Sequence, residues 1–163
     1  MSNTMKQIIE VTSQTEFDAC VAAGNIPLVI KGVLDTWRDA TVHVSGDATV
    51  SAVDNATVYA WGNATVDAAG DATVHAADNT TVNAWGRATV YASGNATVIA
   101  RNNATVYASD NVFIRLYGAL RITATPSVII AMHGTAQSID GGRQMPISLA
   151  PEIGAECEPE QSG

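Results

Sequence analysis

Histidine, acidic and basic side chains that could do chemistry recur in this chain at fixed intervals. His43, Asp67, Tyr91 and Arg115 follow one another at equal spacing, and a histidine next to an aspartate can take up and release a proton. A catalytic triad also needs a Ser or Cys nucleophile supported by a third group, and none accompanies this set. We therefore expect a stacked series of polar partners here, no catalytic residue, and a protein that is not an enzyme.

Aromatic side chains give a stronger candidate for a binding site. Tryptophans recur at the same spacing, and aromatic residues are enriched in protein-binding surfaces and also stack on sugars. The alternative is a structural role, in which stacked tryptophans only hold one corner of the fold together. The sequence predicts one contiguous partner-binding strip, formed by Trp37, Tyr59, Trp61, Asn83, Trp85 and Tyr107.

The chain is acidic, with a formal net charge of −8. Such a surface repels nucleic acid and anionic membranes, and it attracts a basic protein groove. Arg38 is the only basic residue within a run of seven aspartates, Asp35, Asp39, Asp47, Asp54, Asp67, Asp71 and Asp78. A regular negative rod could imitate the phosphates of DNA, although duplex DNA carries about one charge per 1.7 Å and this rod far fewer. Charge alone is therefore too sparse for imitation of DNA, and this hypothesis also requires contacts through the aromatic strip.

Neither a metal nor a cofactor is predicted. Asp47 with Asp71, and Asp54 with Asp78, are expected to stack at corners, but the calcium-binding repeat is a Gly-Gly-x-Gly-x-Asp nonapeptide, unlike the repeat of this chain. Cys20 and Cys157 lack the spacing of a zinc site, so we expect free thiols of a reducing compartment.

Most of these side chains lie on nine consecutive eight-residue units, which run from ATVHVSGD at Ala40 to ATVYASDN. Ala, Val and Ala at positions 1, 3 and 5 alternate with Thr and a variable residue, which is the pattern of a strand with one buried face. Positions 6 to 8 carry Gly, Asp and Asn, which turn the chain. Strands this short must stack in successive coils, so the sequence predicts an all-β, parallel β-helix or solenoid.

The number of units in one coil is read from the variable positions. The 24-residue recurrence of Trp favours three units per coil, and therefore a three-sided β-helix; a two-sided roll of 16 residues is the alternative. We expect the β-helix to be right-handed, although the spacing itself does not determine the hand. Threonine fills position 2 of all nine units, Thr41 through Thr105. Threonine favours strands because it is β-branched, although regular threonine arrays are also found in ice-binding solenoids.

Both ends of a solenoid must be covered, because an open coil exposes apolar side chains and strand edges. A strand is expected over Lys6 to Val11, followed by a short helix that opens with the capping box Ser13–Glu16 and stops at Gly24. The predicted organisation is a strand–helix–strand cap (1–31), the octapeptide solenoid (32–135), a C-terminal cap or dimerisation segment (136–151) and a disordered acidic tail (152–163).

The C-terminal coils are more apolar than the rest, so a homodimer through these coils is expected from the exposed Phe113 and Ile129. The chain shows neither a secretory signal nor an apolar run of roughly 18 residues, which predicts a cytoplasmic protein that does not bind membranes.

The ATVxAxGN units, with the entry sequence EVTSQTEFDACVAAGNIPLVI, resemble a group of uncharacterised repeat proteins of actinobacterial genomes and phages. The resemblance covers roughly residues 7 to 135 and implies the solenoid architecture, but it carries little information on function. A phage or mobile-element origin favours a binding protein that inhibits a host nucleic-acid-binding defence system, of the anti-CRISPR or DNA-mimic type, without contacting nucleic acid directly. The alternatives are an adhesin-like, glycan-binding module and an ice-binding protein.

Overall fold

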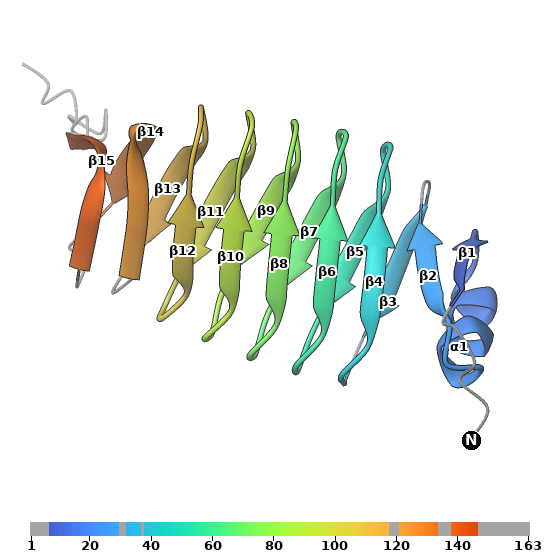
Figure 1. Ribbon diagram of the computed structural model, residues 1–163. Helices are drawn as coiled ribbons and strands as arrows, with labels where there is room; N and C mark the ends of the chain where they lie inside the picture. The colour runs from blue at the N-terminus through green and yellow to red at the C-terminus, as the bar shows by residue number, and fades with distance from the viewer. Residues whose placement is uncertain (1–6, 30–31, 37, 118–120, 134–137, 147–163) are drawn as a thin grey trace, which may run out of the picture.

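The strands of the protein form one continuous 15-stranded sheet that winds into a flat solenoid (Figure 1). The computed structural model describes residues 7–29, 32–36, 38–117, 121–133 and 138–146. All strand pairs in the described part of the chain are parallel. The predicted all-β parallel solenoid with a short N-terminal helix is therefore confirmed.

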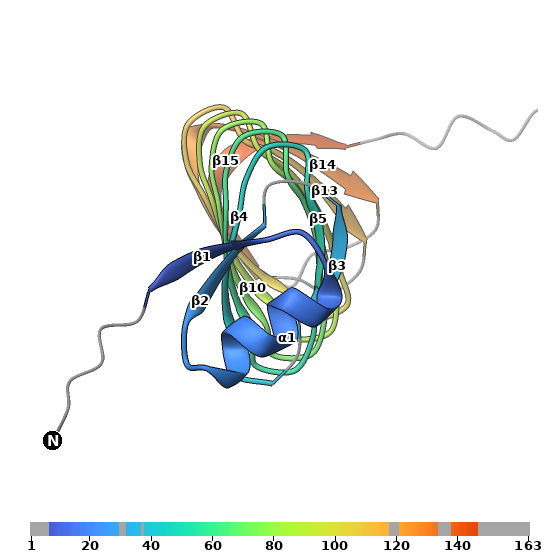
Figure 2. The same ribbon diagram turned by 90° about the vertical axis from the view of Figure 1, so that its right-hand side faces the viewer.

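Each coil contains two strands, that is, two of the octapeptide units. Thr57 pairs with Thr73 in one layer, and Thr65 pairs with Thr81 in the other. The prediction of a three-sided prism with three units per coil is wrong, and the two-sided alternative is correct. The physical reason lies in the inward side chains: Ala and Val are small enough for two sheets to pack directly on one another, so a third wall is not needed. Figure 2, a view along the solenoid axis, shows the flattened cross-section.

One layer begins at the N-terminal cap and is seen in front in Figure 1. Its strands are β1 (Ile8–Val11), β2 (Ile26–Val29), β4 (Thr41–Val44), β6 (Thr57–Ala60), β8 (Thr73–Ala76), β10 (Thr89–Ala92) and β12 (Thr105–Ala108). We call the outward surface of β4, β6, β8, β10 and β12 the aromatic face.

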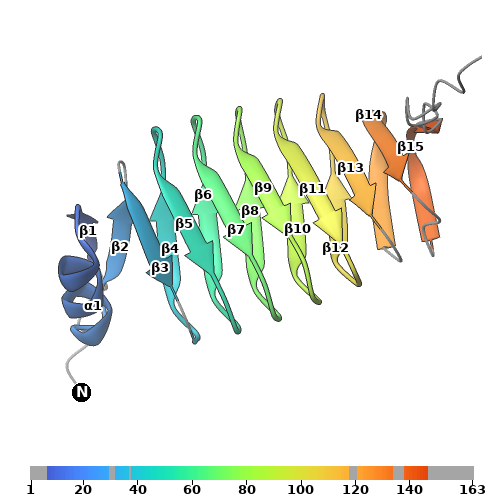
Figure 3. The same cartoon turned by 180° about the vertical axis from the view of Figure 1, so that it is seen from behind.

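The second layer is seen best from behind, in Figure 3. Its strands are β3 (Val33–Thr36), β5 (Thr49–Ala52), β7 (Thr65–Ala68), β9 (Thr81–Ala84), β11 (Thr97–Arg101) and β13 (Phe113–Tyr117). We call their outward surface the charged face. The long strand β14 (Arg121–His133) joins the layers, because its first part pairs with β12 and its second part with β13.

The core is a thin double row of small side chains. The valine at position 3 is fully buried in every unit, and so is the alanine at position 1 in units such as those starting at Ala56 and Ala72. Burying one valine stabilises the fold by roughly 1.5 kcal/mol or more, and the repeat adds one in each strand. Towards the C-terminus the core is built from larger side chains, namely Ile114, Leu116, Ile122 and Ile130.

The corners that follow the strands of the aromatic face carry a row of side-chain amides, which we call the asparagine edge. Each amide nitrogen donates to the oxygen one coil earlier, over 3.3–3.5 Å. The row consists of Asp47, Asn63, Asn79, Asn95 and Asn111. Because these bonds repeat in every coil, the asparagine edge holds successive coils in register.

Helix α1 (Gln14–Ala22) covers the first coil and lies across the end of the solenoid in Figure 2. The backbone N–H of Glu16 donates to the Ser13 hydroxyl, 3.3 Å away, as the predicted capping box requires. In return, the Glu16 carboxylate accepts from the backbone N–H of Thr12 at 2.8 Å, and this hydrogen bond lowers the pKa of Glu16. Phe17 and Cys20 are buried against the core, and burial raises the pKa of the Cys20 thiol.

At the C-terminus the solenoid continues further than the sequence indicated. Strand β15 (Ser138–Pro146) pairs in parallel with both parts of β14, within the segment predicted as a looser cap. Residues 147–151, the acidic tail at 152–163 and Cys157 lie outside the described residues. No helix in the described part of the chain is long and apolar enough to cross a membrane.

Replacing Thr36 by valine is expected to stabilise the protein by about 1 kcal/mol. Thr36 is fully buried, and its hydroxyl is the one buried side-chain polar group among the described residues that lacks a hydrogen-bond partner. Valine has the same shape without the hydroxyl. Thr80 is a matched control, because it is equally buried but donates to the carbonyl of Ala77 at 2.6 Å. Urea unfolding should show a gain for Thr36→Val and a loss for Thr80→Val; equal losses would contradict the prediction.

Candidate functional site

Five aromatic rings stand in a row along the aromatic face, one from each strand between β4 and β12. In order they are His43, Tyr59, His75, Tyr91 and Tyr107, all at position 4 of their units. From Tyr59 to Tyr107 the rings stack almost parallel, with centroids 4.7–5.0 Å apart and planes tilted by 9°. His43 meets Tyr59 edge-on at 5.3 Å. We call this row the ring ladder.

Stacking decides which part of each ring can meet a partner. The flat faces of the inner rings are covered by their neighbours, so the ring edges with their hydroxyl and imidazole groups point outward. Tyr59, Tyr91 and Tyr107 remain 38–43% exposed. A row of threonines at position 2, from Thr41 to Thr105, runs beside the ladder. The surface is therefore regular along the solenoid axis, and it offers hydrogen-bonding groups on an apolar base.

A groove follows the ring ladder on the side of the asparagine edge. One hollow of about 450 Å³ is lined by His43, Tyr59, Trp61, His75 and Tyr91, with small Ala and Ser side chains at its floor. A second hollow of about 400 Å³ continues past Tyr107 to Thr123 and Thr125. Trp61 borders the groove and meets the His43 ring edge-on at 5.6 Å. The groove gives an extended ligand a second wall beside the ladder.

The predicted aromatic strip is wrong as a single surface. Tyr59, Trp61 and Tyr107 do lie together on or beside the aromatic face. Asn83 belongs to β9 on the opposite face, where it donates to Asp67 at 2.7 Å, and Trp85 follows β9 at the opposite edge. Trp37 lies outside the described residues. The reason is the coil length: three units make one and a half coils, so residues three units apart alternate between faces.

The coil length of two units also separates the members of the series His43, Asp67, Tyr91 and Arg115. His43 and Tyr91 belong to the ring ladder, whereas Asp67 and Arg115 lie on the charged face. The expected ladder of His and Asp partners therefore does not form. His43, His75 and Tyr91 were missed as members of the partner-binding strip, and the signal that could have identified them is the recurrence of a ring at position 4 of every second unit.

The seven aspartates of the predicted acidic surface are spread over both edges and one face. Asp35 and Asp67 lie on the charged face, and Asp47 and Asp78 lie at the asparagine edge, Asp78 accepting from the backbone N–H of Gly62 at 3.1 Å. The remaining three, Asp39, Asp54 and Asp71, lie at the corners that follow the strands of the charged face. The predicted stacks of Asp47 on Asp71 and of Asp54 on Asp78 are therefore wrong, because the members of each pair lie at opposite edges.

We call these corners after the charged face the arginine edge. Here the Arg87 guanidinium binds the Asp71 carboxylate through two bonds of 2.7 and 2.9 Å, and the pair lowers the pKa of Asp71. Asn55 donates to Asp39 at 3.1 Å in the same row. By contrast, the strands of the aromatic face from β4 to β12 expose only Thr, Tyr and His. The strands that form the ring ladder thus present no carboxylate and no Arg or Lys.

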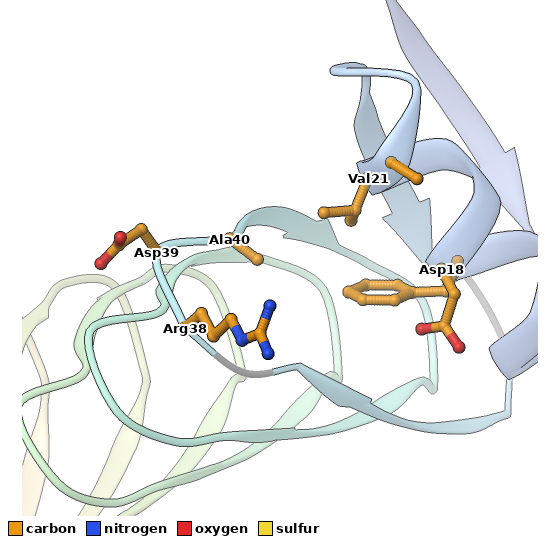
Figure 4. Close-up of a pocket in the computed structure, with 7 residues that line it drawn as sticks. Asp18, Val21, Arg38, Asp39 and Ala40 are labelled. Atoms are coloured by element: carbon orange, nitrogen blue, oxygen red, sulfur yellow. The ribbon is translucent and has the colours of Figure 1, made fainter.

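A further hollow, of about 370 Å³, lies between α1 and the corner that joins β3 to β4 (Figure 4). Phe17 and Val21 form its apolar wall, and Arg38, Asp18 and Asp39 stand around it. Asp18 already accepts from the Gln14 amide at 3.0 Å. The residues that line the hollow include no Ser, Thr, Cys or His, so they do not form a nucleophile–histidine pair. In the described part of the chain, no three His, Cys, Asp or Glu side chains gather as a metal site would need.

Comparison of the chain with known protein families, with characterised proteins and with solved structures gives no match.

Proposed function

We propose that the protein is a non-enzymatic binding module that docks a protein partner on its aromatic face. The observation that carries the proposal is the ring ladder, five rings whose polar edges face outward on a surface without formal charge. Tyrosine gives a large contact area for little loss of side-chain entropy, and stacking orders the rings before the partner arrives. The ladder extends about 19 Å along the axis, since each coil adds about 4.8 Å.

The geometry favours a protein over a glycan as the partner. A sugar stacks on the open face of an aromatic ring, and within the ladder these faces are occupied by the neighbouring rings. A protein surface can instead use the outward hydroxyl edges, the threonine row and the groove beside Trp61. A single threonine row flanks the ladder along β4 to β12, so the aromatic face also lacks the double threonine array that we would require for ice binding.

A narrower form of the proposal is an inhibitor of a nucleic-acid-binding defence protein, which the resemblance to phage and actinobacterial repeat proteins favours. Such a partner has a basic groove. Because the aspartates lie off the aromatic face, the groove would have to reach around an edge, such as the asparagine edge with Asp47, Asp78 and Asp110. Competition by duplex DNA and sensitivity to salt would distinguish this inhibitor from a module that binds an uncharged protein surface.

Replacing Tyr59 and Tyr91 by serine is expected to weaken partner binding strongly. Each buried interface tyrosine contributes about 2 kcal/mol, so the double variant should bind at least about 100-fold more weakly. The measurement is affinity capture from bacterial lysate, followed by titration of the captured protein in purified form. A matched control, Asn83→Ser/Ile99→Ser, removes two outward side chains from the charged face and should bind like the wild type.

Circular dichroism must show that both double variants keep the fold. If the Tyr59→Ser/Tyr91→Ser variant binds the purified partner as tightly as the wild type does, the aromatic face is not the binding surface. Thermal hysteresis or quenching of tryptophan fluorescence by glycans, in the absence of a protein partner, would replace the proposal by one of the two alternative functions.

A further inference from the structure

The charged face is divided into an acidic half and a basic half along the solenoid axis. At position 4, the strands β3, β5 and β7 carry Asp35, Ser51 and Asp67, and none of these three strands presents an outward cation. The strands β9, β11 and β13 carry Asn83, Ile99 and Arg115, and their outward residues include no acid. The formal charge therefore changes sign near the middle of a six-strand surface.

The ends of the same face are apolar at position 2. Val33 on β3 is 75% exposed, the highest value among the large apolar side chains described. At the other end, Phe113 on β13 packs beneath the Arg115 guanidinium, 5.7 Å from the ring centroid, and Ile129 follows it in the next coil with 37% exposure. The four strands between them carry threonine at this position.

The division of charge and the two apolar ends of this face match the same face of a second copy when the strands of that copy follow in the reverse order. We propose that two copies of this chain pair through their charged faces, with antiparallel solenoid axes and a two-fold axis between β7 and β9. Strand β3 then faces β13 of the second copy, which places Val33 opposite Phe113 and Asp35 opposite Arg115. Strand β5 faces β11, and Asp67 on β7 faces Asn83 on β9. A two-fold axis makes every such contact twice, as an isologous interface requires.

Opposite charges at the arginine edge also come together when the strand order of the second copy is reversed. Asp54 follows β5, and Arg101, whose guanidinium lies 5.1 Å from the Tyr117 ring centroid, closes β11. In the antiparallel pair these two residues border the same side of the interface. A uniformly anionic ligand would meet Arg115 but would be repelled by Asp35 and Asp67, so a reversed copy fits the whole face better than a nucleic acid does.

The size of the face limits the strength of the pair. Six strands of four or five residues cover roughly 24 Å by 13 Å, about 300 Å² of strand surface before the edge is added. A stable complex buries about 800 Å² per partner, so the dimer should be weak and reversible. Opposite charges at its periphery make it weaker at high salt. The inference is independent of the proposed function, because pairing through the charged face leaves both aromatic faces free.

Charge reversal provides a sharp test, read by sedimentation equilibrium of the full chain from micromolar to millimolar concentration. Wild type should dimerise at low salt, and the dimer should dissociate as salt rises. Asp35→Arg places two arginines opposite each other at both ends of the interface, and Arg115→Asp places two aspartates there, so each variant should self-associate at least about tenfold more weakly. An equimolar mixture of the two variants should restore the dimer, because both contacts become complementary again.

Tyr91→Ser on the aromatic face is the matched control and should dimerise like the wild type. Circular dichroism confirms that the variants remain folded. The proposal is overturned if the wild type stays monomeric at low salt over the whole concentration range. It is also overturned if either single variant dimerises like the wild type, or if the folded variants fail to associate when mixed.

Discussion

Val74→Asp is expected to unfold the protein at room temperature. Val74 lies on β8 near the middle of the solenoid, is completely buried and belongs to the core between the two layers. An aspartate at this position buries a carboxylate without a partner and removes an apolar contact. Together these effects should cost more than about 4 kcal/mol, a large part of the stability of a chain of this size. Far-UV circular dichroism and urea unfolding measure the loss.

The neighbouring residue gives the control for this substitution. Thr73 lies on the same strand with its side chain on the aromatic face, so Thr73→Asp should cost no more than about 1 kcal/mol. Similar losses of stability for the two variants would mean that Val74 and Thr73 do not lie on opposite sides of the strand.

Gly94→Val is expected to destabilise the protein by about 3 kcal/mol or more. Gly94 has a φ of +70°, a conformation that β-branched residues avoid, and a Cβ atom there would lie 2.9 Å from the backbone nitrogen of Asp78 in the preceding coil. The neighbour is backbone and cannot turn away, so the coils would have to separate. Thermal and urea unfolding report the loss.

Asp54 is the matched control for the conformational part of this effect. It occupies the same position of its unit at the arginine edge, with a φ of +58°. Glycine adopts this conformation easily, so Asp54→Gly should change stability by less than about 1 kcal/mol. A tolerated Gly94→Val would show that the corners are looser than the structure indicates.

The class of fold could be predicted because local chemistry determines it. Alternation of Ala, Val and Ala with Thr requires strands with one buried face, and Ser13 with Glu16 begins the helix that covers the first coil. The core residues of the C-terminal coils, such as Ile114 and Ile130, also followed from the alternation. These features depend on neighbours within one unit, where the side-chain pattern is unambiguous.

The number of units per coil could not be predicted in the same way. Each octapeptide unit has the same inward side chains, so nothing within a unit shows whether two or three of them complete a turn. The prediction relied on three equally spaced tryptophans, two of which, Trp61 and Trp85, lie at opposite edges. The recurrence of His or Tyr in every second unit was the better guide, because stacked rings in adjacent coils contact each other directly.

Only part of the candidate site could be predicted, because the position of its residues depends on the number of units per coil. Tyr59, Trp61 and Tyr107 were placed correctly near one surface, since they belong to strands of one layer or to the corner that follows them. Asn83 and Trp85 were assigned to the wrong surface, because three units make one and a half coils and not one full coil. Ring stacking between His75 and its two tyrosine neighbours depends on contacts between adjacent coils, which become visible only when the coil length is known.

Two units in each coil have a consequence for how such a gene can change. Loss or duplication of one unit would exchange the two outward surfaces for the rest of the chain, whereas loss or duplication of two units removes or adds one coil and leaves each surface as it was. Length can therefore vary in steps of about 4.8 Å without mixing the surfaces. Because adjacent units alternate between the two faces, the ring ladder and the charged face can also accumulate substitutions independently of each other.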